Sequence, residues 1–187
     1  MTTIVGIILV VIFSLLLLFL FVFWVYQIRY SFATDRIVFF PTFLGRIKQP
    51  LMTAIAKYVP NTTNYNLIEL GCGFGHVLKF LSKTFVWKST TGVEIDTITL
   101  QVARLNFWGN KTTQLVQADI LEYSIPDDSV IYCFLGSQIL TQLYASNQLS
   151  NHLVISLDFK IQELEPTETI HIPGISLQKH LYIYDFR

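Results

Sequence analysis

The sequence predicts an α/β fold with a doubly wound, mostly parallel sheet that ends in an antiparallel β-hairpin. First, apolar strand-like segments alternate with amphipathic helical segments from Asn64 onward, which is typical of parallel sheets covered by helices. Second, a glycine-rich turn directly follows the first of these apolar segments. Third, two alternating segments flank Pro173-Gly174 near the end of the chain, which indicates a hairpin.

An uncharged apolar segment, residues 4–28, precedes this domain. A helix rises about 1.5 Å per residue, so a segment of this length crosses a bilayer core of about 30 Å. Unlike a signal peptide, it has no basic start and no small-residue cleavage site. We therefore expect residues 1–29 to be a single-pass transmembrane anchor, with Trp24, Tyr26 and Tyr30 at the membrane interface.

Basic residues lie on one side of this segment only. Apart from the amino group of the chain, no positive charge precedes it, whereas Arg29, Arg36, Arg46 and Lys48 follow it. Positively charged flanks stay on the cytoplasmic side of a membrane. The following domain is therefore expected in the cytoplasm or in the matrix of an organelle.

Residues 30–60 are predicted to be a connector with one short helix. Regular helix is not expected across Pro41, because proline lacks an amide hydrogen and restricts the residue before it. Pro50 is predicted to open a helix that ends near Tyr58. The apolar stripe of this helix favours packing against the domain, and a lid over the ligand site is the alternative. The stripe consists of Leu51, Ile55 and Tyr58.

Residues 61–187 are predicted to form the α/β domain. The expected strands are Asn66–Leu70, Thr91–Ile95, Gln114–Ala118, Ser129–Leu135 and His152–Phe159, and the hairpin consists of Thr167–Ile172 and Leu177–Phe186. The expected helices are His76–Phe85, Thr97–Trp108 and Gln138–Ala145. Asp96 is a suitable N-cap for the second of these helices, and Gly109 is a suitable residue to end it.

Three glycines, Gly71, Gly73 and Gly75, follow the first strand at every second position. Because they lack a Cβ, they permit a tight turn and a close approach to a ligand, and the next helix directs its amino end there. The third glycine comes one residue earlier than in the G-x-G-x-x-G pattern of nicotinamide and flavin sites. No G-K-[ST] follows, which excludes a Walker A loop.

Two carboxylates follow the neighbouring strands. Glu94 ends the second strand, where a carboxylate accepts hydrogen bonds from ribose hydroxyls. Asp119 follows the third strand and is placed to accept a hydrogen bond from the exocyclic amine of adenine. Within the first strand, Glu69 is expected to be buried and to need a partner. The expected partners of Glu69 are backbone amides of the glycine turn or the amino group of the cofactor.

The composition argues against several other functions. Lysine plus arginine and aspartate plus glutamate number 13 each, so nothing favours nucleic acid as a partner. Cys72 and Cys133 lie in apolar segments and are expected to be buried free thiols in a reducing compartment. The four histidines show no metal-ligand spacing with these cysteines, so no metal site is expected.

The segments E-L-G-C-G-F-G, G-V-E-I-D and Q-A-D-I resemble motifs I, II and III of class I S-adenosylmethionine-dependent methyltransferases. The resemblance covers roughly Tyr58 to Arg187 and implies a Rossmann-like fold with S-adenosyl-L-methionine as cofactor. It implies that the glycine turn faces the methionine part of the cofactor, that Glu94 holds the ribose and that Asp119 contacts adenine. The implied cofactor-binding residues are Glu69, Gly71, Cys72, Gly73, Gly75, Glu94, Ile95, Asp119 and Ile120.

The layout is also similar to a narrower group, the small membrane-anchored protein-lysine methyltransferases. These include mitochondrial enzymes acting on the ATP synthase c-subunit and the adenine nucleotide translocase, with bacterial and archaeal relatives. The similarity rests on the single apolar helix, Phe39-Phe40-Pro41-Thr42, S-V-I-Y-C-F-L-G and L-V-I-S-L-D-F before a hairpin. The chain departs from the group at Phe74 and His76, where an acid and an arginine are usual, and it lacks a proline near Gly136-Ser137.

This resemblance implies N-methylation of lysine in a protein substrate, membrane proteins included. An amine must arrive neutral, and a dry slot lowers its pKa, so no dedicated general base is required. The expected substrate slot lies past the fourth strand. It consists of Phe40, Pro41, Thr42, Phe134, Leu135 and Gly136. The alternative for Phe134 and Leu135 is ordinary sheet core.

Two other functions stay open at the level of sequence. A membrane anchor also gives access to a lipid, a quinone or another hydrophobic small molecule as methyl acceptor. A non-enzymatic anchored protein with a degenerate cofactor fold is the other alternative. The retained glycines, Glu94 and Asp119 argue against that last reading.

Overall fold

The computed structural model describes residues 2–34, 42–174 and 178–187. The chain forms two compact units, Met1–Phe40 and Pro41–Arg187. The positions predicted for the substrate slot at Phe40 and Pro41 lie outside the described residues, as does Leu177 in the predicted hairpin.

The described part of the first unit is one helix, α1 (Thr2–Thr34). Its segment Val5–Tyr26 is long and apolar enough to cross a membrane. The predicted anchor, residues 4–28, is helical throughout, but the helix ends later than predicted. Residues 29–34 contain no glycine or proline, so nothing in the local sequence stops the helix there.

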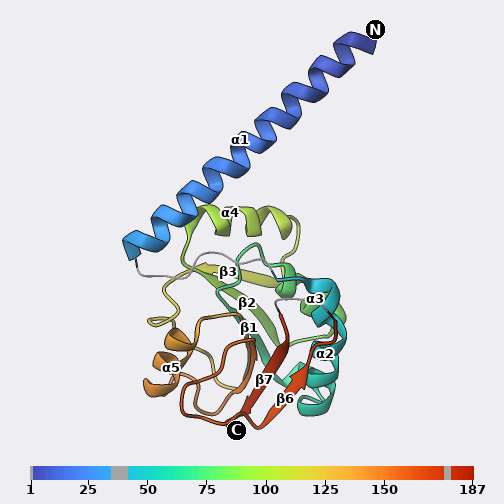
Figure 1. Cartoon of the computed structure of the whole chain (residues 1–187). Helices are drawn as coiled ribbons and strands as arrows, with labels where there is room; N and C mark the ends of the chain where they lie inside the picture. Colours follow the sequence, from blue (N-terminus) through green and yellow to red (C-terminus); the bar gives the residue numbers. More distant parts are fainter. Residues whose placement is uncertain (1, 35–41, 175–177) are drawn as a thin grey trace. The chain divides into compact units, whose positions relative to one another are not determined.

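The second unit is built on a seven-stranded sheet with the order β3-β2-β1-β4-β5-β7-β6 (Figure 1). Strands β1 to β5 run parallel, and β7 pairs antiparallel with both β5 and β6. The predicted fold class is therefore confirmed. The strands are β1 (Asn66–Leu70), β2 (Ser89–Glu94), β3 (Thr113–Gln117), β4 (Ser129–Cys133), β5 (Leu153–Leu157), β6 (Glu168–His171) and β7 (His180–Asp185).

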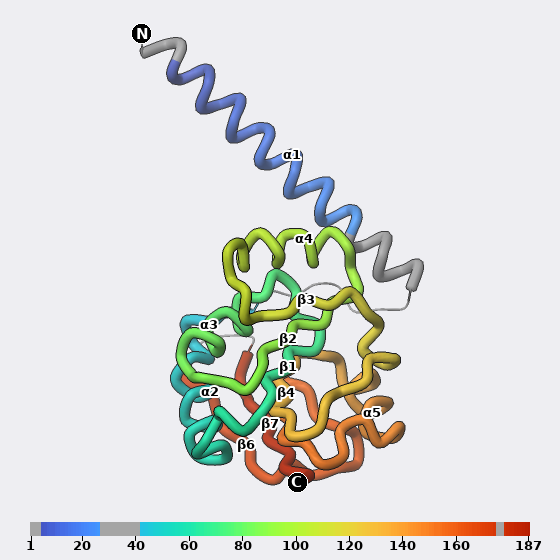
Figure 2. The backbone as a smooth tube through the Cα atoms, turned by 180° about the vertical axis from the view of Figure 1, so that it is seen from behind, coloured from blue at the N-terminus to red at the C-terminus, as the bar shows by residue number. Residues whose placement is uncertain are grey.

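Helices cover both faces of this sheet. The helices are α2 (Leu44–Tyr58), α3 (His76–Thr84), α4 (Thr97–Asn106) and α5 (Ser137–Ala145), with a short 3-10 turn at Thr62–Asn64. Helices α2 and α3 lie on one face and α5 on the other, while α4 lies beside the edge strand β3 (Figure 2). Apart from the start of α2, the strands and helices of this unit begin and end within three residues of the predicted positions.

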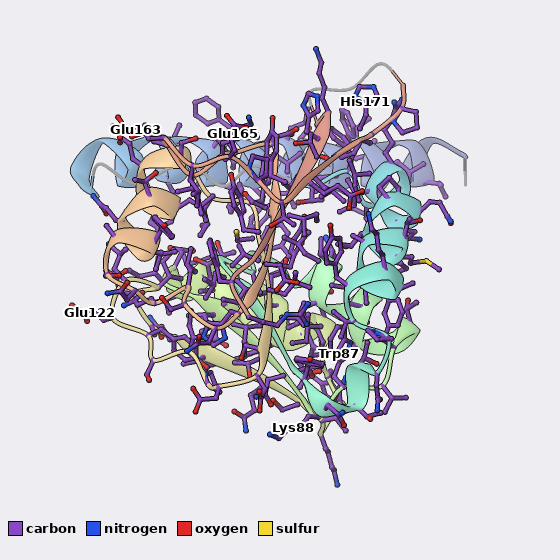
Figure 3. The ribbon with its side chains drawn as sticks, turned by 90° about the horizontal axis from the view of Figure 1, so that it is seen from below. Trp87, Lys88, Glu122, Glu163, Glu165 and His171 are labelled. Atoms are coloured by element: carbon purple, nitrogen blue, oxygen red, sulfur yellow. The ribbon has the colours of Figure 1, made fainter. Side chains whose placement is uncertain are left out.

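Side chains on the two faces of the sheet form two apolar cores. Leu67 and Tyr132 belong to the core under α2 and α3, and their neighbours Ile68 and Ile131 belong to the core under α5. This alternation follows from the strand geometry, and burial on both faces is expected of central parallel strands. Side chains fill the interior of the domain, whereas the labelled Lys88 lies at its periphery (Figure 3).

The prediction that Pro50 opens a helix is wrong. Helix α2 begins at Leu44 and contains Pro50 in its interior, where proline removes one hydrogen bond of the helix. Packing compensates for this loss, because Ile47 before the proline and Leu51 after it are both fully buried. The favoured packing role of α2 is confirmed, since its apolar face belongs to the core and Lys57 Nζ donates to Glu168 Oε1 of β6 at 2.8 Å.

Candidate active site

The carboxyl ends of the parallel strands meet at one edge of the sheet. Leu70, the last residue of β1, is in register with Val93 of β2 and Cys133 of β4. Glu94 of β2 is in turn in register with Gln117 of β3. The segments that follow these strands therefore lie side by side. They contain the glycine turn and most of the residues predicted to bind the cofactor.

The glycine turn has a backbone conformation that favours glycine. Gly71, Gly73 and Gly75 have φ angles of 68°, 54° and 73°, in the left-handed region that costs other residues free energy. The Gly75 amide closes the turn by donating a hydrogen bond to the Cys72 carbonyl at 2.8 Å. The Cys72 amide connects the turn to β2 by donating to the Val93 carbonyl at 2.9 Å.

Glu94 connects the glycine turn to β2. Its Oε2 accepts a hydrogen bond from the Gly73 amide at 2.9 Å, and its Oε1 accepts from the amides of Ile95 at 2.9 Å and Asp96 at 3.0 Å. Burial raises the pKa of Glu94, and these three amide donors oppose the rise. The sequence predicted a ribose contact for this carboxylate but not its role in holding the turn.

Glu69 caps α3 and not the glycine turn, which corrects one of its two expected partners; the other, the amino group of the cofactor, stays a prediction. The N-cap of α3 is Gly75, which has no side chain to accept a hydrogen bond. Glu69 Oε2 instead accepts from the Leu78 amide in the first turn of α3, at 2.7 Å. Burial raises the pKa of Glu69 to about 8, the Leu78 amide opposes this rise, and Glu94 adds to it.

The raised pKa of Glu69 predicts a pH dependence of stability. Because the folded state favours the protonated carboxyl, this stabilisation is complete below the ordinary pKa of 4.5 and is lost as the pH rises through about 8. Across that window the free energy of unfolding should fall by up to about 1.4 kcal/mol per pH unit. Urea unfolding between about pH 5 and about pH 9 measures it. In Glu69→Gln this dependence should be flatter, and an equally steep dependence would contradict the assignment to Glu69.

Asp119 and two isoleucines complete the edge next to Glu94. Asp119 Oδ1 accepts from the Leu121 amide at 3.0 Å, which orients the carboxylate in the turn after β3. Ile95 and Ile120 are half-buried, and Ile120 packs against the core under α5. The predicted N-cap is confirmed, because Asp96 Oδ1 accepts from the Thr99 amide at 2.7 Å.

The described residues of the predicted substrate slot lie past β4 and before α2. Phe134 is half-buried, and its ring centroid lies 5.6 Å from that of Phe159, which follows β5. Leu135 is 9% exposed and contacts the glycine turn, since its Cδ2 lies 3.0 Å from the position of a Cβ on Gly71. Gly136 is the N-cap of α5, and Thr42 is half-buried.

Tyr132 is a candidate site residue that sequence reasoning missed. It is 1% exposed, yet its hydroxyl forms no hydrogen bond of good geometry with the described residues. Burial raises its pKa well above the usual range, Glu69 adds to the rise and Thr42 opposes it. Tyr132 and Glu69 are in register on neighbouring strands. The sequence signal that could have indicated this residue is a tyrosine inside the otherwise apolar segment S-V-I-Y-C-F-L.

Asp158 is a second residue that was missed, and its role is structural. It has a φ of 60°, and its Oδ1 accepts from the amides of Lys179 at 2.6 Å and His180 at 3.0 Å. The carboxylate therefore fixes the end of β5 against the start of β7. This contact positions Phe159, the aromatic partner of Phe134.

Comparison with known proteins bears on both the fold and the site. Residues 68–145, which contain the glycine turn, Glu94 and Asp119, match the family described as Methyltransferase domain. A relative from Saccharolobus islandicus (strain REY15A), named Protein-lysine N-methyltransferase, is 28% identical over 141 residues. The match covers 71% of this chain and 84% of the relative.

Solved structures share the arrangement of strands and helices. An RNA methyltransferase from Salinibacter ruber in complex with S-adenosyl-L-homocysteine matches with a TM-score of 0.63 and 20% identity, covering 78% of this chain and 92% of that one. The chain has a class I S-adenosylmethionine-dependent methyltransferase fold. TrmK of M. capricolum, in complex with S-adenosyl-homocysteine, matches this methyltransferase fold with a TM-score of 0.56 and 16% identity, covering 73% and 68% of the two chains.

The residues at the edge of this methyltransferase fold fit S-adenosylmethionine as cofactor. A carboxylate accepts about four hydrogen bonds, and backbone amides supply three to Glu94, so an acceptor position is left for a ribose hydroxyl. Ile95 and Ile120 would flank the adenine, and Asp119 would accept from its amine. The glycine turn and the amino end of α3 would hold the methionine part.

Thiol chemistry does not fit this methyltransferase site. Cys72 and Cys133 are buried free thiols, as expected from their apolar context. Burial raises the pKa of Cys133 to about 12 and that of Cys72 well above its usual range. Since the thiolate is the reactive form, neither cysteine is available as a nucleophile near neutral pH.

Proposed function

We propose that the chain is a membrane-anchored methyltransferase that transfers a methyl group from S-adenosylmethionine to lysine side chains of a protein substrate. The observation that carries the choice of lysine is the relative named Protein-lysine N-methyltransferase, because the match spans 84% of that protein and not only a cofactor motif. Methyl transfer itself is supported by the matched methyltransferase domain.

The aromatic groups past β4 suit an amine acceptor. The rings of Phe134 and Phe159 lie 5.6 Å apart and give the predicted slot an apolar lining. Apolar surroundings lower the pKa of an amine, so a lysine would enter this slot in its neutral, nucleophilic form. The cofactor supplies the methyl group, and the protein contributes orientation and exclusion of water.

Membrane anchoring is the second part of this proposal. Val5–Tyr26 is supported as a membrane span by its length and composition. Arg29, Arg36, Arg46 and Lys48 follow it. We infer that the second unit lies on the cytoplasmic side, or the matrix side in an organelle.

The acceptor can be identified by labelling. Membranes from a strain that lacks this protein are incubated with S-adenosylmethionine carrying a labelled methyl group and the purified full chain. Labelled protein bands that yield methyl-lysine on hydrolysis are expected. Label that extracts into organic solvent would instead assign a lipid or quinone acceptor. Absence of both cofactor binding and labelling would refute the methyltransferase proposal itself.

Tyr132→Phe is expected to separate stability from activity. Removing a buried hydroxyl that forms no hydrogen bond of good geometry with the described residues should stabilise the fold by about 1–2 kcal/mol. If that hydroxyl contacts the bound acceptor, its loss should lower kcat by about tenfold, the equivalent of about 1.4 kcal/mol, and leave cofactor affinity unchanged. Thermal unfolding measures the stability, calorimetry measures the cofactor affinity, and the labelling assay measures kcat.

Tyr184→Phe is the matched control. Tyr184 is equally buried at 1% exposure, but its hydroxyl accepts a hydrogen bond from the Ile161 amide at 3.0 Å. The control should therefore lose stability and keep its kcat. A Tyr132→Phe variant with unchanged kcat would remove Tyr132 from the acceptor site.

A further inference from the structure

The outer face of α4 exposes large apolar side chains. Ile98, Leu105 and Trp108 are 47%, 63% and 85% exposed, and they recur at the spacing of one helical face. Trp108 lies in the turn that continues the helix, where its amide donates to the Leu105 carbonyl at 3.2 Å. The opposite face of α4 is occupied by buried residues that include Leu100 and Ala103. The outer apolar face is therefore not needed for packing the helix onto the sheet.

The segment that contains this face, from Thr97 to Ala118, carries positive charge only. Between Thr97 and Ala118 the sequence contains Arg104 and Lys111 and no aspartate or glutamate. Both basic residues are exposed, whereas the whole chain has 13 residues of each sign. Basic residues next to a membrane attract anionic lipid headgroups, and an exposed indole ring is typical of the membrane interface.

We propose that this face of α4 docks onto the anionic surface of the bilayer that holds α1. The α4 patch is defined as Ile98, Arg104, Leu105, Trp108 and Lys111. The inference rests on the membrane anchor proposed above, because a span at Val5–Tyr26 confines the second unit to the neighbourhood of lipid. Such a tether gives a high effective concentration, so a small apolar and basic patch is sufficient for docking.

Docking of the α4 patch would also orient the active site. Helix α4 begins at Thr97, only three residues after Glu94 at the carboxyl edge of the sheet. A docked α4 would hold this edge beside the headgroup region. Lysine side chains that emerge from the bilayer on membrane proteins would then be within reach of the substrate slot.

The environment of Trp108 tests the proposal directly. The chain has three tryptophans, so Trp24→Phe with Trp87→Phe leaves Trp108 as the sole fluorophore in the full chain. The protein is reconstituted in vesicles that contain anionic lipid. Lipids brominated near the headgroup should quench Trp108, and its quenching by iodide should be several-fold weaker than in the detergent-solubilised protein.

Charge variants provide matched controls. Arg104→Glu with Lys111→Glu should restore most of the iodide quenching of Trp108 in vesicles. Lys48→Glu with Lys179→Glu changes the net charge equally at two exposed lysines. They lie on α2 and before β7, at the edge of the sheet opposite β3, and should have no effect. Calorimetry with S-adenosyl-homocysteine checks that every variant is folded and keeps its cofactor site.

The outcomes separate the failure of docking from the failure of the proposed function. If the protein floats with the vesicles but iodide still quenches Trp108 and brominated lipid does not, docking is overturned and the anchor stays intact. Failure to float overturns both anchor and docking, and cofactor binding is measured independently of either. If Trp108 is shielded from iodide in detergent and light scattering shows a dimer, the patch binds a second copy of the chain. That result overturns the lipid proposal.

Discussion

Glu94→Ala is expected to lower the affinity for S-adenosyl-homocysteine by at least about 100-fold. The substitution removes the acceptor for the ribose and also the bridge from the Gly73 amide to β2, 2.9 Å long. Hydrogen bonds to charged groups contribute about 1.5–3 kcal/mol each, and about 1.4 kcal/mol corresponds to tenfold in affinity. Isothermal titration calorimetry on the full chain measures the change.

Two control variants make this result specific to Glu94. Glu94→Gln keeps one acceptor oxygen, so it should retain part of the affinity. Glu122→Ala removes an exposed carboxylate in the segment after Asp119 and should leave the affinity within about twofold, because exposed charges contribute little. Full affinity in Glu94→Ala would exclude Glu94 from the cofactor site and weaken the proposed function with it.

Gly75→Ala is expected to reduce the free energy of unfolding by about 2–4 kcal/mol. Gly75 has a φ of 73°, and a Cβ on it would lie 2.6 Å from Cε2 of Phe107. The Phe107 ring is only 6% exposed and belongs to the core under α2 and α3, so it cannot move without disturbing that core. Cofactor affinity should fall as well, because the turn and the first turn of α3 shift together.

Gly109→Ala separates the two causes of this loss. Gly109 has almost the same φ, 77°, but nothing lies within 4 Å of a Cβ there. Its substitution should cost only the backbone term of about 1–2 kcal/mol. Thermal unfolding compares the two variants, at roughly 2–4 °C per kcal/mol for a domain of this size. Equal losses would contradict the steric role of Phe107.

The elements that were predictable are those whose pattern is local. Alternation of strands and helices fixes the parallel part of the sheet, because each apolar strand must be covered on both faces. The cap at Asp96 was predictable for the same reason, since it involves a residue three positions away. The start of α2 was not predictable locally, because burial of Ile47 outweighs the interruption at Pro50.

The polar contacts of the site depended on tertiary structure. That Glu69 needs a partner follows from its place in a buried strand, but the partner is the Leu78 amide on another element. The second role of Glu94 depends on how closely the glycine turn approaches β2. Tyr132 looked like one more apolar strand residue, and only the environment of its hydroxyl distinguishes it.

The bridge between Glu94 and the Gly73 amide has a kinetic consequence. Because the turn is already held in place by the protein's own hydrogen bonds, a ligand that enters does not have to order it. Ordering of mobile groups costs about 0.5–1.5 kcal/mol for each immobilised side chain. We therefore expect S-adenosyl-homocysteine to associate in a single fast phase, without a slow rearrangement of the glycine turn.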